Sequence, residues 1–313
     1  MRLTSNGLRI ARVDDDGQMP RNCDLSWRVR HVDALAAEVH EGSSFARVEG
    51  QRTEAGLVTH HVFGTGGFIK CRFSISPDGS DVLTSTTPRI NDCDVVDLFS
   101  ESVMRTILVR RGLASLHAAA LVRDGGAILL LGHKGAGKST LSAALQMQGW
   151  RLLADHLVRI DQIDGIWQCF PGHRRMKLRP DAARALGYPD DLGGRWASPE
   201  ADGSLEAPKV IVEPPNDLLP LASAPIAAIF TLKPRRPEQE HMAAERARPA
   251  QTVAALLSNA TPDPLSMNAA ASAVSPAAIS GLARQAQIHQ VTLPDRLADL
   301  HASAKAVAAM AAI

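Results

Sequence analysis

A run of five apolar residues in the middle of the chain leads directly into a glycine-rich loop. Of all the features of the sequence, this junction places the strongest constraint on the fold. The run covers residues 127–131, and an apolar stretch of this length predicts a buried strand. The loop that follows is Gly132-His133-Lys134-Gly135-Ala136-Gly137-Lys138-Ser139-Thr140. Its spacing matches G-x-x-x-x-G-K-[ST] at every fixed position, and a helix is expected over residues 139–148. The strand–loop–helix order predicts an α/β fold.

The residue types of this loop suit a phosphate ligand. Glycines allow the backbone to turn several N–H groups inward, and the helix that follows directs its positive end toward the same place. Lys138 adds a positive charge for the β and γ phosphates, and the Ser139 hydroxyl is a usual ligand of Mg²⁺. We therefore expect residues 132–140 to bind a nucleoside triphosphate, namely ATP with Mg²⁺. Lys134 either adds a second cation inside the loop or lies solvated on its outer face.

The pattern of strands and helices divides the chain in two. Residues 1–95 predict a mostly-β module, for which substrate docking is one role considered, with strands at residues 25–32, 45–48, 57–63 and 68–75. Helical spacing over residues 94–111, with Asp94 as a cap, forms the bridge into an α/β domain that we assign to residues 96–313. Further strands of that domain are expected at residues 116–122, 152–154, 157–160, 167–170, 227–232 and 288–293. Further helices are expected at residues 180–186, 252–259, 277–287 and 295–311.

Composition and charge exclude several classes of protein. The formal net charge is +1, from 34 basic and 33 acidic residues, which argues against a protein that wraps nucleic acid or binds membranes through basic clusters. The four cysteines form no CxxC pair and show no metal-ligand spacing, so free, buried thiols are expected. The sequence shows no apolar core of a signal peptide and no run long enough to cross a bilayer, which indicates a cytoplasmic protein.

Other segments separate the classes of protein that share such a loop. A GTPase should carry an N-K-x-D segment that reads guanine, and an ABC-type ATPase should carry an S-G-G-Q-like signature, but the chain contains neither. Small-molecule kinases usually have an arginine-rich lid, for which Arg235-Arg236, or Arg246 with Arg248, are weak candidates. The segments on either side of the loop must therefore decide between the classes.

Two short segments flank the loop in a recognisable order. Leu116-His117-Ala118-Ala119 lies one strand before it, and Leu152-Leu153-Ala154-Asp155 lies about one helix after it. This order resembles the catalytic domain of HPr kinase/phosphorylase and its relatives. These are serine protein kinases built on a P-loop, and they include kinases of lasso precursor peptides. The resemblance covers residues 116–178 and extends toward the C-terminus, but it does not include residues 1–95.

The resemblance implies a fold, an activity and roles for single residues. It implies an HPr-kinase-like P-loop domain that transfers the γ-phosphoryl group of ATP to a serine of a peptide or small protein. Asp155 would act as general base on the serine hydroxyl and would hold Mg²⁺ together with Ser139. His117 would either orient Asp155 or balance charge on the phosphoryl group beside Lys138, unless it is a core histidine. Relatives often form hexamers, so a homo-oligomer is also considered.

One position departs from the family pattern. The second aspartate of the A-D-D segment is His156 here, and a neutral imidazole gives no negative charge to Mg²⁺. Glu206 and Glu213 are candidates to compensate for it. The basic segment 171–180 either contacts phosphate or an acidic peptide, or is a solvated surface. Two other functions stay open: a nucleotide-binding regulatory or assembly protein without transfer chemistry, and a small-molecule kinase.

Overall fold

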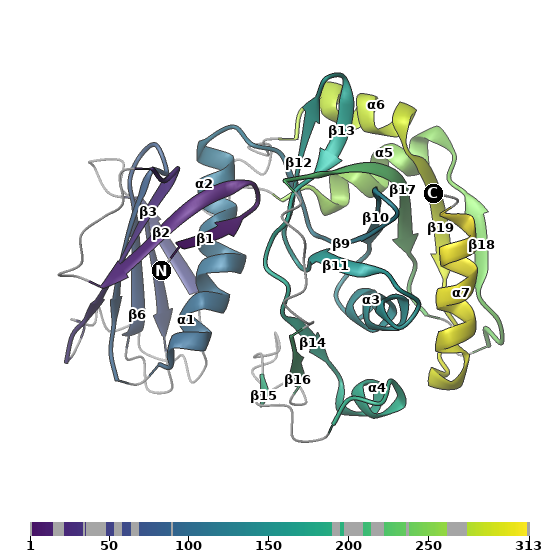
Figure 1. Cartoon of the computed structure of the whole chain (residues 1–313), viewed down its shortest axis with the longest axis horizontal. Helices are drawn as coiled ribbons and strands as arrows, with labels where there is room; N and C mark the ends of the chain where they lie inside the picture. Colours follow the sequence, from purple (N-terminus) through teal and green to yellow (C-terminus); the bar gives the residue numbers. More distant parts are fainter. Residues whose placement is uncertain are drawn as a thin grey trace. The chain divides into compact units, whose positions relative to one another are not determined.

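The computed structural model describes residues 2–14, 22–33, 35, 48–52, 58–63, 69–88, 90–189, 195–196, 209–213, 222–235, 238–261 and 274–311. These residues form a mixed α/β structure with several sheets (Figure 1), which confirms the predicted α/β class. They divide into two compact units, one that reaches to Leu113 and one that begins at Ala114.

The first unit is built on a seven-stranded sheet in the order β1-β2-β3-β7-β6-β5-β4. Its strands are β1 (Arg2–Ser5), β2 (Leu8–Asp14), β3 (Leu25–His31), β4 (Val48–Arg52), β5 (Val58–Phe63), β6 (Ile69–Ile75) and β7 (Asp81–Thr86). Strand β3 runs parallel to β2 and β7, whereas β6 pairs antiparallel with β5 and β7. Residues 45–47 of one predicted strand lie outside the described residues, and the sequence did not predict β1, β2 and β7.

One helical segment belongs to this sheet. It consists of α1 (Asp92–Leu98), a π-helical turn η1 (Phe99–Val103) and α2 (Met104–Arg110). The predicted cap at Asp94 is wrong, because the side chain of Asn91 accepts the hydrogen bond from the Asp94 backbone N–H at 2.7 Å. The ring of Phe99 stacks on Trp27 of β3, with ring centroids 3.8 Å apart. The helix is therefore part of the first unit, which ends at Leu113, whereas the sequence places the boundary at residue 95.

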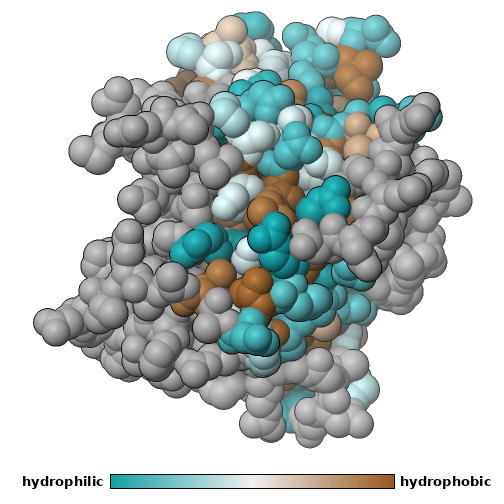
Figure 2. Space-filling view, turned by 90° about the vertical axis from the view of Figure 1, so that its left-hand side faces the viewer, coloured by the Kyte–Doolittle hydropathy of each residue, from teal (hydrophilic) through white to brown (hydrophobic). Residues whose placement is uncertain are grey.

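Along strands β3, β6 and β7, buried residues alternate with half-buried or exposed ones, and the latter are polar except for Leu83 of β7. The polar members that are half-buried or exposed include Ser26, Arg28, Arg30, Arg72, Ser74 and Ser85. Figure 2 views the molecule from the left-hand side of Figure 1, and there the described surface is largely hydrophilic with a few hydrophobic residues between. Such alternation is expected of a sheet that packs one face on a core and leaves the other face polar.

A nine-stranded sheet forms the centre of the second unit. Its order is β11-β9-β10-β17-β13-β12-β8, and β19 pairs with both β17 and β18. The strands are β8 (Ser115–Leu116), β9 (Ala118–Arg123), β10 (Gly126–Leu131), β11 (Arg151–Ala154), β12 (Val158–Ile163), β13 (Ile166–Cys169), β17 (Ala224–Leu232), β18 (Ala243–Arg246) and β19 (Gln287–Thr292). Strand β17 runs parallel to β10 and to β19. The loops that follow these three strands therefore leave the same edge of the sheet.

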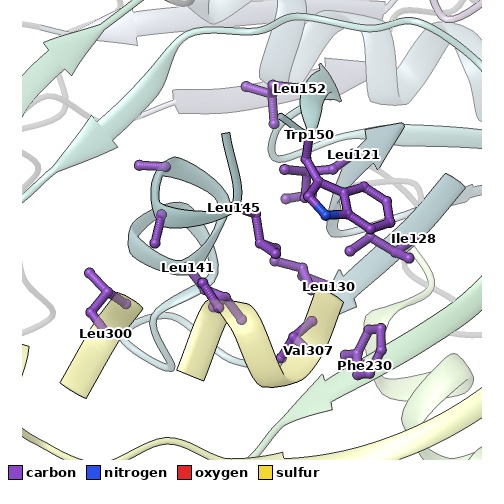
Figure 3. Packing of buried hydrophobic residues seen from close by; sticks show 14 of the residues in the cluster. Leu121, Ile128, Leu130, Leu141, Leu145, Trp150, Leu152, Phe230, Leu300 and Val307 are labelled. Atoms are coloured by element: carbon purple, nitrogen blue, oxygen red, sulfur yellow. The ribbon is translucent and has the colours of Figure 1, made fainter. Parts of the chain in front are cut away.

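Alternate residues of β10 enter two hydrophobic clusters. Ile128 and Leu130 join a cluster with α3 (Lys138–Gln146) and α7 (Leu300–Met310), part of which is shown in Figure 3. Leu129 and Leu131 join a second cluster with residues of α5 (Pro249–Asn259) and α6 (Pro276–Gln285). All four leucine and isoleucine side chains of β10 are fully buried. The strand before the glycine-rich loop is thus packed on both sides, which fixes the start of the loop.

Smaller elements complete the second unit. A three-stranded sheet contains β14 (Met176–Leu178), β15 (Arg195–Trp196) and β16 (Lys209–Val212). The helix α4 (Pro180–Ala185) contacts β16 and the short helix η2 (Leu297–Asp299). In the described part of the chain, no helix is long and apolar enough to span a membrane. The four cysteines are free, as predicted, and Cys71 and Cys169 are buried, but the predicted burial is wrong for Cys93, which is exposed, and for Cys23, which is half-buried.

Candidate functional site

The glycine-rich loop lies between the end of β10 at Leu131 and the start of α3 at Lys138. The backbone angle φ is +147° at Gly132 and +99° at Gly137, a region that favours glycine. A Cβ atom on Gly132 would lie 2.9 Å from the carbonyl oxygen of Leu232 in β17, which is closer than real Cβ contacts. The first glycine of the motif is therefore required by the close approach of the neighbouring strand.

Substitution Gly132→Ala should lower the free energy of unfolding by about 3 kcal/mol, because the methyl group adds steric overlap to an unfavourable φ. Thermal or denaturant unfolding measures this loss. Gly135→Ala is the matched control, since φ there is +85° but no atom lies within 4 Å of the added Cβ. We expect that control to lose about 1 kcal/mol, from the φ angle alone. Equal losses in the two variants would contradict the steric role of Gly132.

Lys138 turns back over the loop. Its Nζ donates hydrogen bonds to the backbone oxygens of Gly132, at 2.6 Å, and of His133, at 3.4 Å. Lys138 is buried, and burial lowers its pKa while the nearby charge of Asp155 raises it. Carbonyl oxygens are weaker partners for an ammonium group than anionic oxygens are. The lysine is therefore positioned to exchange these partners for a phosphate group.

A hydroxyl and a carboxylate meet beside this lysine. The Ser139 hydroxyl donates a hydrogen bond to Oδ2 of Asp155 at 3.1 Å. Asp155 follows β11, and the pairing of β11 with β9 brings it to the first turn of α3. Its side chain is buried, and its backbone N–H donates to the backbone oxygen of His173 at 2.8 Å. The fold thus gathers Lys138, Ser139 and Asp155 at one end of α3.

Two histidines lie next to each other at this place. The ring centroids of His117 and His156 are 4.6 Å apart, and the rings are nearly perpendicular at 86°. His156 follows Asp155 with φ of +75°, a conformation that costs a non-glycine residue about 1 kcal/mol. His117 therefore contacts the residue that replaces the second aspartate of the family pattern.

Asn259, which the sequence did not single out, connects the loop to the histidine. Its side-chain oxygen accepts a hydrogen bond from the backbone N–H of Gly132 at 3.2 Å, and its backbone oxygen accepts from the N–H of His117 at 2.7 Å. Its side-chain amide donates to the backbone oxygen of Ala255 at 2.8 Å, and the residue is buried. Asparagine near a helix end is common, so no local signal distinguishes this one.

Substitution Asn259→Ala should weaken both stability and nucleotide binding. It leaves the buried N–H of Gly132 without its acceptor, which costs about 1–3 kcal/mol. Unfolding experiments measure the stability and titration with ATP measures the affinity. Asn259→Asp keeps an oxygen for the Gly132 N–H but loses the donor to Ala255 and buries a charge, so it should recover only part of the ATP affinity. An unchanged affinity in Asn259→Ala would show that Asn259 does not position the loop.

Arg235 approaches the loop from another direction. A Cβ on Gly137 would come within 2.8 Å of Nη2 of Arg235, so the guanidinium group packs on this glycine. Nη1 of Arg235 donates to Oδ1 of Asp295 at 3.2 Å. The arginine follows β17, and the aspartate follows β19.

The other charged residues named from the sequence lie in different places: Lys134 belongs to the loop itself, whereas Glu213, Arg246 and Arg248 belong to or follow other elements. Glu213 forms an ion pair with Arg175 at 2.8 Å, and Lys134 is exposed. Glu206 and Arg236 lie outside the described residues, whereas Arg246 and Arg248 are exposed. Within the described ranges, no group of three or more histidine, cysteine, aspartate or glutamate side chains is arranged to hold a metal ion. Glu213 is thus engaged with the basic segment.

Comparison with known proteins finds similarity only among solved structures. No protein-family model matches the chain, and no curated protein matches it in sequence. Among solved structures, the chain is similar to the Hpr(Ser) kinase/phosphatase from Coxiella burnetii, at 12% sequence identity and a TM-score of 0.25. The similarity covers 63% of this chain and 98% of that chain. A TM-score of this size does not establish a shared fold, so the proposed function rests on the residues of the site.

Proposed function

We propose that this protein is an ATP-dependent serine kinase that acts on a peptide or a small protein. The observation that carries the proposal is the 3.1 Å hydrogen bond between Ser139 and Asp155, beside the buried Lys138. It sets a carboxylate next to a loop whose glycines and helix start suit a phosphate ligand. The order of the flanking segments, which resembles that of HPr kinase/phosphorylase, supports the same function.

The described residues fit a triphosphate with Mg²⁺. Among the described residues, the hydrogen-bond acceptors of the Lys138 Nζ are backbone oxygens at 2.6 and 3.4 Å, and phosphate oxygens are stronger partners for it. Ser139 and Asp155 offer the hydroxyl and carboxylate oxygens that Mg²⁺ prefers. When bound, Mg²⁺ supplies positive charge to the phosphate oxygens. We assign its protein ligands to Ser139 and Asp155.

Asp155 then serves as the base of the transfer. Its carboxylate accepts the proton of the substrate hydroxyl while that oxygen bonds to the γ phosphorus, and ADP leaves as the bridging P–O bond breaks. Lys138 stabilises the negative charge on the phosphate oxygens. His156 directly follows this base and His117 contacts His156, so we assign to His117 either the orientation of the base or the balance of charge on the phosphoryl group.

A binding experiment and a labelling experiment test the proposal together. Calorimetric titration with ATP and Mg²⁺ should show binding to the purified protein. Incubation with γ-labelled ATP should then label an acceptor peptide or protein, such as an HPr-like protein or a lasso-type precursor peptide. Replacement of the acceptor serine by alanine should abolish the label. Label on free serine or on a sugar would instead identify a small-molecule kinase, and absence of ATP binding would contradict the proposal as a whole.

A nucleotide-binding regulatory protein without transfer chemistry is the second candidate. His156 favours it, because the residue after Asp155 gives no negative charge to a metal ion. The ion pair of Glu213 with Arg175 also favours this candidate, because Glu213 is one of the carboxylates that could replace the negative charge missing at His156. For this candidate we expect tight ATP binding and no labelled product with any acceptor.

A further inference from the structure

A second cation, Arg235, lies on the side of the loop opposite to Asp155. Strand β10 has β9 and β17 as its two neighbours in the sheet. Asp155 follows β11, which pairs with β9, whereas Arg235 follows β17. The loop after β10 therefore has the carboxylate on one flank and the guanidinium group on the other.

The guanidinium group of Arg235 is held in place, but part of its surface and one of its N–H groups are not engaged by the described residues. It packs on Gly137 and donates to Asp295 at 3.2 Å, while its side chain keeps 27% of its surface exposed. Its Nε is buried and has no hydrogen-bond partner among the described residues. An arginine fixed in this manner presents a planar cationic face at small entropic cost.

A shallow depression adjoins this arginine. Its lining includes Thr140, Arg235, Leu293, Pro294, Arg296 and Leu297. Thr140 lies in the first turn of α3, directly after Ser139, and the residues from Leu293 onward belong to the loop that follows β19. The depression encloses about 10 Å³, which is room for a single water molecule. It is therefore too small to enclose a ligand, so any contact with a ligand is made at its rim.

We propose that Arg235 and the rim of this depression form the subsite for the nucleoside of the bound triphosphate. The inference rests on the proposed function, in which the γ phosphate lies toward Asp155 and the nucleoside end points to the opposite flank of the loop. The guanidinium plane stacks on the base through a cation–π contact. Leu293 and Pro294 are buried below this place, and the half-buried Leu297 supplies apolar surface to the same ring or to the ribose. The hydrogen bond to Asp295 keeps the guanidinium group next to Gly137.

Inorganic tripolyphosphate separates this role from a phosphate contact, since it carries the phosphate chain of ATP without a nucleoside. Calorimetry should be carried out with both ligands and Mg²⁺ on the whole protein. Because a cation–π contact contributes up to about 2 kcal/mol, Arg235→Ala should weaken ATP binding on the order of tenfold. The same variant should bind tripolyphosphate within about twofold of the wild-type affinity if no phosphate contact is lost. Arg284→Ala, which removes an exposed arginine of α6, is the control and should change neither affinity.

The outcomes distinguish the subsite from its rivals. Equal losses for ATP and tripolyphosphate would make Arg235 a phosphate ligand and would overturn the proposal, and so would unchanged affinity for both. If Arg235→Ala fails to fold, Arg235→Lys keeps the charge and the pairing with Asp295 but removes the planar face, and it should still lose ATP affinity alone. Wild-type protein that binds neither ligand would contradict the proposed function itself. Wild-type protein that binds both ligands equally well would contradict only the nucleoside subsite.

Discussion

Asp155→Asn should reduce phosphoryl transfer by about a hundredfold to ten-thousandfold, the usual contribution of a general base, while the protein still binds ATP. Asparagine has nearly the size of aspartate, and its amide oxygen can still accept the hydrogen bond that Ser139 donates at 3.1 Å. It cannot accept the proton of the substrate hydroxyl. The loss therefore concerns the chemical step and leaves the loop and Lys138 in place.

Two measurements on the same preparation check this expectation. Calorimetric titration gives the affinity for ATP, and transfer of label from γ-labelled ATP gives the rate. Asp161→Asn is the matched control, since it makes the same chemical change at an aspartate of β12 that pairs with Arg159 at 2.7 Å. That control should keep both activities. Full transfer activity in Asp155→Asn would disprove the role of Asp155 as the base.

The fold was predictable where the pattern of side chains is local. Strands β10 and β17 are continuous apolar runs, because both faces of their sheet are covered, and such runs are visible in the sequence. Strand β18 (AAER) is exposed at every residue and forms only through its backbone pairing with β19. No apolar period marks such an edge strand, so its existence depends on a partner about 45 residues away, farther than local patterns reach.

The same contrast explains the helix of the first unit. Helical spacing over residues 94–111 predicted the element, and the structure has helical segments from Asp92 to Arg110. The sequence treats this helix as a bridge between domains, whereas Phe99 stacks on Trp27 and ties the helix to the first sheet. This contact joins residues far apart in the chain. Spacing within a helix shows which face is apolar but not which surface will cover that face.

For the candidate site, the sequence shows what lies along the loop but not what approaches it from elsewhere. The motif itself identifies Lys138 and Ser139, and the resemblance to HPr kinase/phosphorylase points to Asp155 and His117. Asn259 reaches Gly132 across 127 positions of the chain, and its residue type carries no signal of that contact. In the sequence, Arg235 stands out only as one member of the basic pair Arg235-Arg236. Its position against Gly137 depends on the parallel pairing of β17 with β10.

Lys138→Ala should weaken the binding of ATP on the order of a hundredfold, since hydrogen bonds to charged groups contribute up to about 3 kcal/mol each. The Nζ of Lys138 lies inside the loop, at 2.6 Å from the backbone oxygen of Gly132, and burial already lowers its pKa. Burial disfavours the charged form of the lysine, and a bound triphosphate stabilises that form by placing negative charge next to the ammonium group. Tripolyphosphate should lose affinity to the same extent as ATP, in contrast to the selective loss expected for Arg235→Ala.

Comparison with two other lysines shows whether the effect is local. Lys134 belongs to the same loop but is exposed, so Lys134→Ala should lose much less affinity for both ligands. Lys305 is exposed on α7, and Lys305→Ala should bind as the wild type does. Unfolding experiments on Lys138→Ala test for damage to the loop, because the variant leaves the Gly132 oxygen without its donor. Equal losses in Lys138→Ala and Lys134→Ala would mean that the loop attracts anions through its general charge and that the buried ammonium group has no special role.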